Sequence, residues 1–127
     1  MQQQLSRSQK QDILNRIKQT EDIDEIIKYT YYEDNDIRLK AVSEMCPCRV
    51  KDDNDEFWVR IFQMANDPDP KIRYKVLHIM CDGSPERLEN EIIQQLNQFN
   101  RDLDKDIKRL AHKVLGSYQK TGKWNIL

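Results

Sequence analysis

The sequence is poor in the residues that interrupt helices, with three glycines and four prolines among 127 residues. Because both residues break helices, this composition favours long helices joined by short turns. The sequence also lacks an apolar run of about 18 residues, the length that a membrane-spanning helix needs. Nor does it begin with the basic and then apolar pattern of a secretory signal. We therefore expect a cytoplasmic protein without a membrane span.

Sequence motifs of catalysis are also missing. The two histidines precede Ile79 and Lys113, so the chain lacks the adjacent His-Glu pairs that serve as metal ligands in some hydroxylases. It has neither a glycine-rich loop for phosphate nor the strand-turn-helix motif that presents a nucleophilic serine. We expect that the protein is not an enzyme.

A motif repeats three times at a fixed spacing of 35 residues. The sequences DNDIR, DPKIR and DKDIK occupy residues 34–38, 69–73 and 104–108. A period between 20 and 50 residues indicates stacked units of secondary structure. The apolar residues that keep the same register are Ile23, Trp58 and Ile93; Ala41, Val76 and Ala111; and Met45, Met80 and Leu115.

Each unit contains two stretches with apolar residues at helical spacing. Just before the second stretch, Asp34, Asp69 and Asp104 stand where a side chain can cap the helix, and Pro70 occupies the first helical position, which favours proline. Ser84 before Pro85 suggests a cap of the same kind for the third unit's first helix. The expected first helices cover residues 21–32, 55–66 and 87–100, the second helices cover 35–46, 70–81 and 105–118, and a capping helix covers 7–19.

These features resemble HEAT repeats, of the short bacterial kind grouped with bilin-lyase-like HEAT repeats. The resemblance covers residues 21–118 and rests on the Asp-Pro turn at 67–70 and on the Ile-Arg pair in the second helix. It implies an all-α, armadillo-type fold: a right-handed α-solenoid of about three helical hairpins, with the second helices on the concave side. The expected single domain, 1–127, divides into a cap (1–20), repeats (21–51, 52–86 and 87–118) and a tail (119–127).

The basic residues Arg38, Arg73 and Lys108 align across the units. They form either a row that binds anions or a structural ladder with the turn aspartates Asp34, Asp69 and Asp104. We favour the ladder, because an acidic residue stands at a fixed offset in every unit.

A neighbouring face of the second helices varies in residue type from unit to unit, as a ligand-binding surface does. The alternative is a merely solvated face on which Tyr74 lies flat. The candidate partner-binding residues are Leu39, Lys40, Ser43, Lys71, Tyr74, Lys75, His78, Arg109 and Lys113.

The segments 37–51, 71–81 and 107–127 carry net charges of +3, +3 and +5. A basic groove attracts an acidic peptide or a phosphate backbone. Because few aromatic residues besides Tyr74 are available to stack on bases, we favour protein over nucleic acid. We predict a monomeric scaffold that binds an acidic protein segment, with nucleic-acid binding or end-to-end assembly as alternatives.

Three cysteines, an odd number without a secretory signal, predict reduced thiols. Cys46, Cys48, Cys81 and His78 invite comparison with zinc sites. However, Cys46 and Cys81 would lie on helices about 8 to 10 Å apart, which is long for two sulfurs that must each lie about 2.3 Å from one metal. We expect buried, inert thiols, no metal and no cofactor.

The carboxyl-terminal residues 120–127 contain a glycine followed by Trp124, Ile126 and Leu127. They either fold back over the last unit or form a short linear motif for a partner. We favour folding back, because an uncovered final helix would expose an apolar stripe to water.

Overall fold

The computed structural model describes residues 4–46 and 54–127, and within these ranges it contains helices and no strand. The all-α class is therefore confirmed. The predicted boundary between residues 51 and 52 lies outside the described residues. The helices are α1 (Arg7–Gln19), α2 (Ile23–Tyr29), α3 (Asn35–Ser43), α4 (Asp55–Met64), α5 (Pro70–Met80), the short 3-10 helix η2 (Glu86–Leu88), α6 (Glu89–Phe99) and α7 (Lys105–Thr121).

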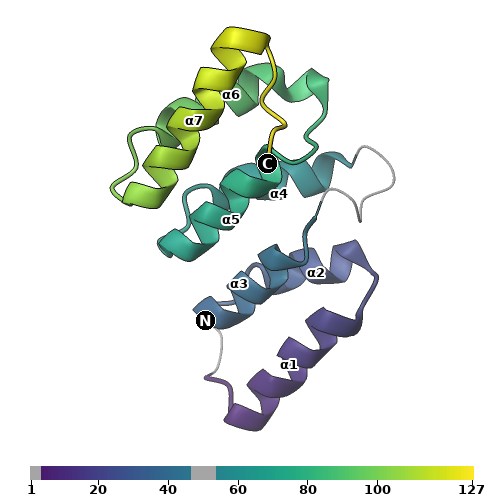
Figure 1. Cartoon of the computed structure of the whole chain (residues 1–127). Helices are drawn as coiled ribbons and strands as arrows, with labels where there is room; N and C mark the ends of the chain where they lie inside the picture. The colour runs from purple at the N-terminus through teal and green to yellow at the C-terminus, as the bar shows by residue number, and fades with distance from the viewer. Residues whose placement is uncertain (1–3, 47–53) are drawn as a thin grey trace.

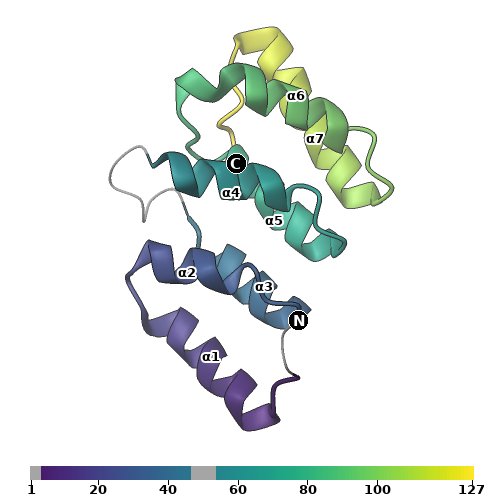
Figure 2. The same cartoon turned by 180° about the vertical axis from the view of Figure 1, so that it is seen from behind.

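The helices form pairs that lie one above another. Helix α2 packs against α3, α4 against α5 and α6 against α7, while α1 packs against α3 at one end. Viewed from opposite sides, Figures 1 and 2 show α3, α5 and α7 in one layer and α2, α4 and α6 in the other. Helices α2 to α7 overlap the ranges predicted for the three units, and α1 covers the range 7–19 that was predicted ahead of them. None of the described helices is long and apolar enough to cross a bilayer.

The turn aspartates cap the second helices, as the spacing predicted. Asp34 Oδ1 accepts hydrogen bonds from the amides of Asp36, at 2.8 Å, and Ile37, at 3.1 Å. Asp69 accepts from the Lys71 amide at 2.9 Å. Asp104 caps α7 in the same way. Each such cap stabilises its helix by about 1 kcal/mol, because it satisfies an amide that has no partner within the helix.

The core follows the apolar stripe of the second helices, and positions 37, 72 and 107 are each a fully buried isoleucine. One position differs between the second helices. Val42 and Leu77 are fully buried, whereas the corresponding His112 is exposed. Within the described residues no other helix pair covers this side of α7, which leaves His112 in contact with water.

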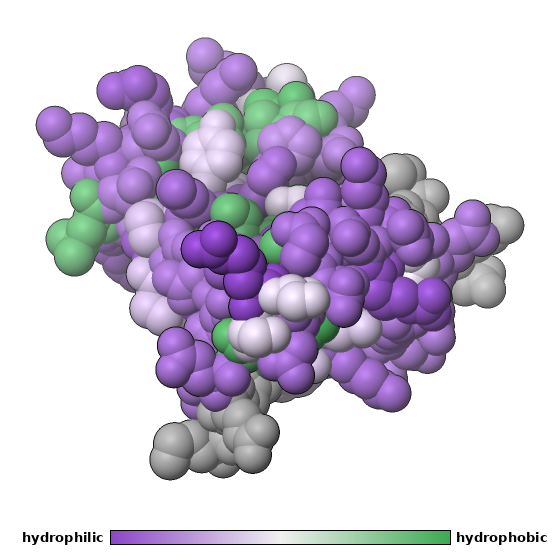
Figure 3. Space-filling view, turned by 90° about the horizontal axis from the view of Figure 1, so that it is seen from below, coloured by the Kyte–Doolittle hydropathy of each residue, from purple (hydrophilic) through white to green (hydrophobic). Residues whose placement is uncertain are grey.

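Polar residues cover the other end of the stack, where α1 lies. Figure 3 views this end and shows a mostly hydrophilic surface with small, separate apolar patches. In α1, Ile17 is the buried residue. Lys10 joins α1 to α3 through Asp34 and Asp36, with Nζ to Oδ2 distances of 3.0 and 2.7 Å. Helix α1 thus covers α3 and presents a polar face to solvent.

The carboxyl-terminal tail folds back onto the connection between α5 and α6. The chain reverses after α7 at Gly122, whose φ of 75° suits a residue without a side chain. Trp124 is buried and its indole donates to Ser84 Oγ at 2.7 Å, while the Leu127 amide donates to the Cys81 carbonyl at 2.9 Å. Folding back was therefore predicted correctly, but the tail seals the junction of two pairs rather than the outer face of the last one.

Ser84 does not cap a helix, contrary to the sequence prediction. Its buried hydroxyl donates to the Met80 carbonyl at 2.6 Å and accepts from Trp124. Helix α6 begins only at Glu89, after η2, and its N-cap residue makes no side-chain hydrogen bond. Ser84 instead accepts a hydrogen bond from Trp124 of the tail. The local sequence does not reveal this tertiary contact.

Candidate binding surface on the second helices

The predicted partner-binding residues are all exposed or half-buried, and they come from the three second helices. Helix α3 supplies Leu39, Lys40 and Ser43; α5 supplies Lys71, Tyr74, Lys75 and His78; and α7 supplies Arg109 and Lys113.

Part of this set lines one hollow of about 500 Å³ that runs across α3, α5 and the start of α7. Leu39, Lys71, Tyr74 and Lys75 lie around it, together with Pro70. Tyr74 is 39% exposed, so its ring is available to a ligand. A tyrosine beside two lysines can contact an apolar group while the ammonium groups attract a carboxylate.

The other predicted residues lie outside the lining of this hollow: Lys40, Ser43, His78, Arg109 and Lys113. Two of them make local contacts that explain their orientation. Lys40 Nζ lies 3.7 Å from Glu44 Oε1. Ser43 Oγ donates to the Leu39 carbonyl at 2.7 Å, a bond within its own helix.

Two acidic residues that sequence reasoning missed, Asp104 and Asp106, complete the lining. Asp104 caps α7, and its Oδ1 accepts from the Asp106 amide at 2.9 Å. Both therefore sit at the amino end of α7, beside the amino end of α5 and Lys71. Since successive second helices run in the same direction, the repeat register already placed these ends next to each other. The hollow consequently has charges of both signs.

The arginine ladder exists, but its partners differ from those predicted. Arg38 Nε and Nη2 donate to Oδ2 and Oδ1 of Asp67, at 3.0 and 3.2 Å. Arg38 Nη1 also donates to the Tyr32 and Glu33 carbonyls. The predicted partners Asp34, Asp69 and Asp104 instead cap helices. The arginines instead reach the aspartates that lie two residues before the caps of the following second helices, Asp67 and Asp102.

The next unit repeats this arrangement. Arg73 Nε and Nη2 donate to Asp102 at 3.0 and 3.1 Å. Burial raises the pKa of the Asp102 carboxyl, but the hydrogen bonds from Arg73 and from the Asp104 amide outweigh it, so this pKa lies below its usual value. The corresponding Lys108 forms no ion pair within the described part of the chain. Arg38 and Arg73 therefore hold neighbouring helix pairs together, whereas Lys71, Lys75 and Arg109 are exposed to solvent.

The cysteines behave in two ways. Cys81 is a free, buried thiol, and burial raises its pKa to about 12. Cys46 is disulfide-bonded, so the prediction of reduced thiols is wrong for it, because an odd cysteine count still permits one pair. Cys48 lies outside the described residues. Among those that are described, no group of three or more potential metal ligands occurs, and His78 is exposed.

Comparisons of the chain with protein-family models, with curated proteins and with solved structures gave no match.

Proposed function

We propose that the chain is a short HEAT-like α-solenoid that serves as a non-catalytic scaffold and binds an acidic protein segment on its second-helix face. The observation that carries this proposal is the hollow in which Lys71 and Lys75 flank the exposed ring of Tyr74. Leu39 adds an apolar contact at its edge. Such a combination suits a segment with both acidic and apolar side chains.

The packing of the helices supports a concave second-helix layer. Helices α3, α5 and α7 contact one another more extensively than α2 contacts α4, and α4 and α6 contact each other little. A stack whose one layer is more tightly spaced curves toward that layer. Curved stacks of repeats commonly bind their partners along the inner surface. The right-handed twist of the proposed solenoid rests on the resemblance to HEAT repeats.

The charges of α5 favour an anionic partner, since Lys71 and Lys75 are exposed and this helix carries no acidic residue. Asp104 and Asp106 add negative charge at the other side of the hollow, so they repel acidic side chains there. We expect a bound segment to place acidic side chains over the lysines and an uncharged or basic residue beside the two aspartates. Mixed charges at a rim add specificity more than affinity.

A nucleic acid fits this surface less well. The two aspartates would repel a phosphate backbone that followed the hollow. Only one aromatic ring, Tyr74, lies in its lining, whereas proteins that bind single strands stack successive bases on several rings.

The proposal is tested by titrating the protein with fluorescein-labelled dodecapeptide pools of fixed composition, either Glu, Leu and Ser or Lys, Leu and Ser, and with a twelve-nucleotide single-stranded DNA. We expect the acidic pool to bind best, and the double variant Lys71→Glu, Lys75→Glu to weaken its binding at least tenfold. Lys18→Glu with Lys28→Glu makes the same charge change elsewhere and should have little effect. Equal loss in both double variants would refute the assigned surface. Tighter DNA binding, with a steep log-linear salt dependence, would favour the nucleic-acid alternative.

A further inference from the structure

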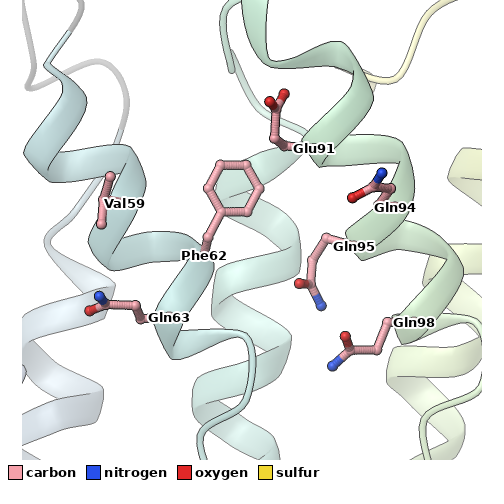
Figure 4. Close-up of a pocket in the computed structure, with 7 residues that line it drawn as sticks. All are labelled: Val59, Phe62, Gln63, Glu91, Gln94, Gln95 and Gln98. Atoms are coloured by element: carbon pink, nitrogen blue, oxygen red, sulfur yellow. The ribbon is translucent and has the colours of Figure 1, made fainter.

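A groove lies on the opposite side of the stack, between the first helices α4 and α6, with a volume of about 460 Å³. Figure 4 shows the two helices facing each other across it. Because α5 and α7 pack closely while α4 and α6 contact little, the groove follows from the way the two pairs are stacked. It is lined by Val59, Phe62 and Gln63 from α4 and by Glu91, Gln94, Gln95 and Gln98 from α6.

In two of its glutamines, one polar atom of the side-chain carboxamide is hydrogen-bonded to a neighbouring residue and the other bonds to no described residue. Gln63 Oε1 accepts a hydrogen bond from Arg60 Nη1 at 3.0 Å. Arg60 itself is fixed by Thr30 and stacks on the Tyr31 ring, 3.7 Å from its centroid. On the other wall, Gln98 Nε2 donates to Asn66 Oδ1 at 2.8 Å. The groove thus holds a prepositioned amide donor on Gln63 and a prepositioned carbonyl acceptor on Gln98.

A third glutamine, Gln95, is the only described residue with a buried side-chain nitrogen or oxygen that lacks a hydrogen-bond partner; the atom is Nε2. Buried polar atoms without partners are rare in folded proteins and call for an explanation. In Figure 4 its carboxamide points into the gap between α4 and α6, below the Phe62 ring in this view. An acceptor that enters this gap would meet the donor once the Gln95 side chain rotates toward it.

The chemistry of the lining identifies the class of ligand. Glutamine carboxamides offer a donor and an acceptor together, as the main chain of an extended peptide does. Val59, which is 56% exposed, and Phe62 offer an apolar contact for one side chain of such a peptide. Glu91 is the single charged residue of the lining, and α6 carries Glu89 and Glu91 without any basic residue. This charge favours a cationic side chain and repels phosphate.

We propose that the groove between α4 and α6 binds an extended peptide segment. Its main chain pairs with the glutamine carboxamides, an apolar side chain lies on Phe62, and a lysine or arginine lies beside Glu91. This inference is independent of the proposed function, because the groove lies on the other layer and has the opposite charge preference. A chain with both surfaces joins an acidic segment on one side to a basic segment on the other.

The test uses NMR of the whole chain, labelled with ¹⁵N, and follows the side-chain amide signals of the glutamines. The probes are pools of octapeptides with blocked ends. Each pool has one fixed leucine and one fixed arginine, glutamate or alanine, and the number of residues between the two differs from pool to pool. We expect an arginine pool to shift the signals of Gln63, Gln95 and Gln98 and to bind at least tenfold more tightly than the matching glutamate pool.

Two variants and a control make the test decisive. Glu91→Gln should abolish the preference for arginine over glutamate. Gln95→Leu should weaken binding at least tenfold without lowering the melting temperature, because it removes a buried polar atom that has no partner. The double variant Lys71→Glu, Lys75→Glu on the other layer should leave these shifts unchanged. The proposal is wrong if no pool moves the three signals at millimolar concentration, if Glu91→Gln keeps the preference, or if the signals shift with protein concentration alone, which would indicate a second copy in the groove.

Discussion

The guanidinium of Arg38 forms two parallel hydrogen bonds with the carboxylate of Asp67, which lies 29 residues further along the chain. Their side chains are only 11% and 8% exposed. The pair joins α3 to the turn before α5, so it stabilises the contact between two helix pairs rather than the structure within one. Arg73 and Asp102 do the same for the next two pairs.

Replacing Arg38 by alanine should therefore destabilise the fold strongly. The change leaves the Asp67 carboxylate buried without its partner, which costs about 3 to 5 kcal/mol. Urea denaturation measures the loss. Lys108→Ala alters the corresponding residue of α7, which forms no ion pair with any residue that the structure describes, and should change stability by less than about 0.5 kcal/mol. Similar losses in the two variants would show that the Arg38 pair contributes nothing beyond helix propensity.

Removing the indole of Trp124 should loosen the junction between α5 and α6. Trp124 is 5% exposed and donates to Ser84, so Trp124→Ala should cost about 3 to 5 kcal/mol, as truncations of large buried side chains do. Thermal unfolding followed by circular dichroism gives the change. Ile126→Ala, at a position of the same tail that is 39% exposed, serves as the control and should shift the melting temperature less. A stable Trp124→Ala variant would mean that the tail only rests on the surface.

The thiol of Cys81 should resist alkylation in the folded protein. Burial raises its pKa to about 12, so at pH 8 almost none of it is the reactive thiolate. We expect iodoacetamide to modify Cys81 slowly under native conditions and rapidly in concentrated urea, as read by mass spectrometry of the peptide that contains it. Equal rates in both conditions would contradict the buried position.

Acid should weaken the junction of α1 and α2 through Glu25. Hydrogen bonds from Arg16, with those from Thr20 and Tyr29, lower the pKa of Glu25 from 4.5 to about 2. Because the folded value is the lower one, this stabilisation is complete above about pH 4.5 and is lost as the pH falls from there to about 2.

The measurement is the unfolding free energy between pH 5 and 2. Glu25→Gln should flatten its pH dependence in this range. Glu21→Gln, at an exposed residue outside this hydrogen-bonded group, should leave the dependence as it is. If Glu25→Gln and the parent protein show the same slope, the carboxylate does not contribute in the way its hydrogen bonds indicate.

Sequence reasoning placed the helices well because the signals are local. The apolar stripe that includes Ile37 and Ala41 specifies a helix and its buried face within a few residues. Asp34 and Asp69 mark helix starts because a cap acts on amides two or three positions away. Local patterns also showed that Tyr74, Lys71 and Lys75 share one face, and the structure places them around one hollow.

The same reasoning failed where the answer depends on how one helix pair sits on the next. It selected Asp69 rather than Asp67 for the ladder, since both aspartates lie in the same turn and only the stacking offset decides between them. It missed Asp104 and Asp106 in the hollow for a related reason, although the repeat register contained the necessary signal. It drew no attention to the glutamines of α6, because their spacing is typical of a solvated helix face.

The order of elements, their capping residues and the buried stripes were determined by the sequence alone, because each depends on interactions between residues close together in the chain. Tertiary structure decided the partners of Arg38 and Arg73, the junction that Trp124 seals and the gap between α4 and α6. These features depend on distances between helices of different pairs, and such distances are set by the fit of whole side-chain surfaces rather than by any local pattern.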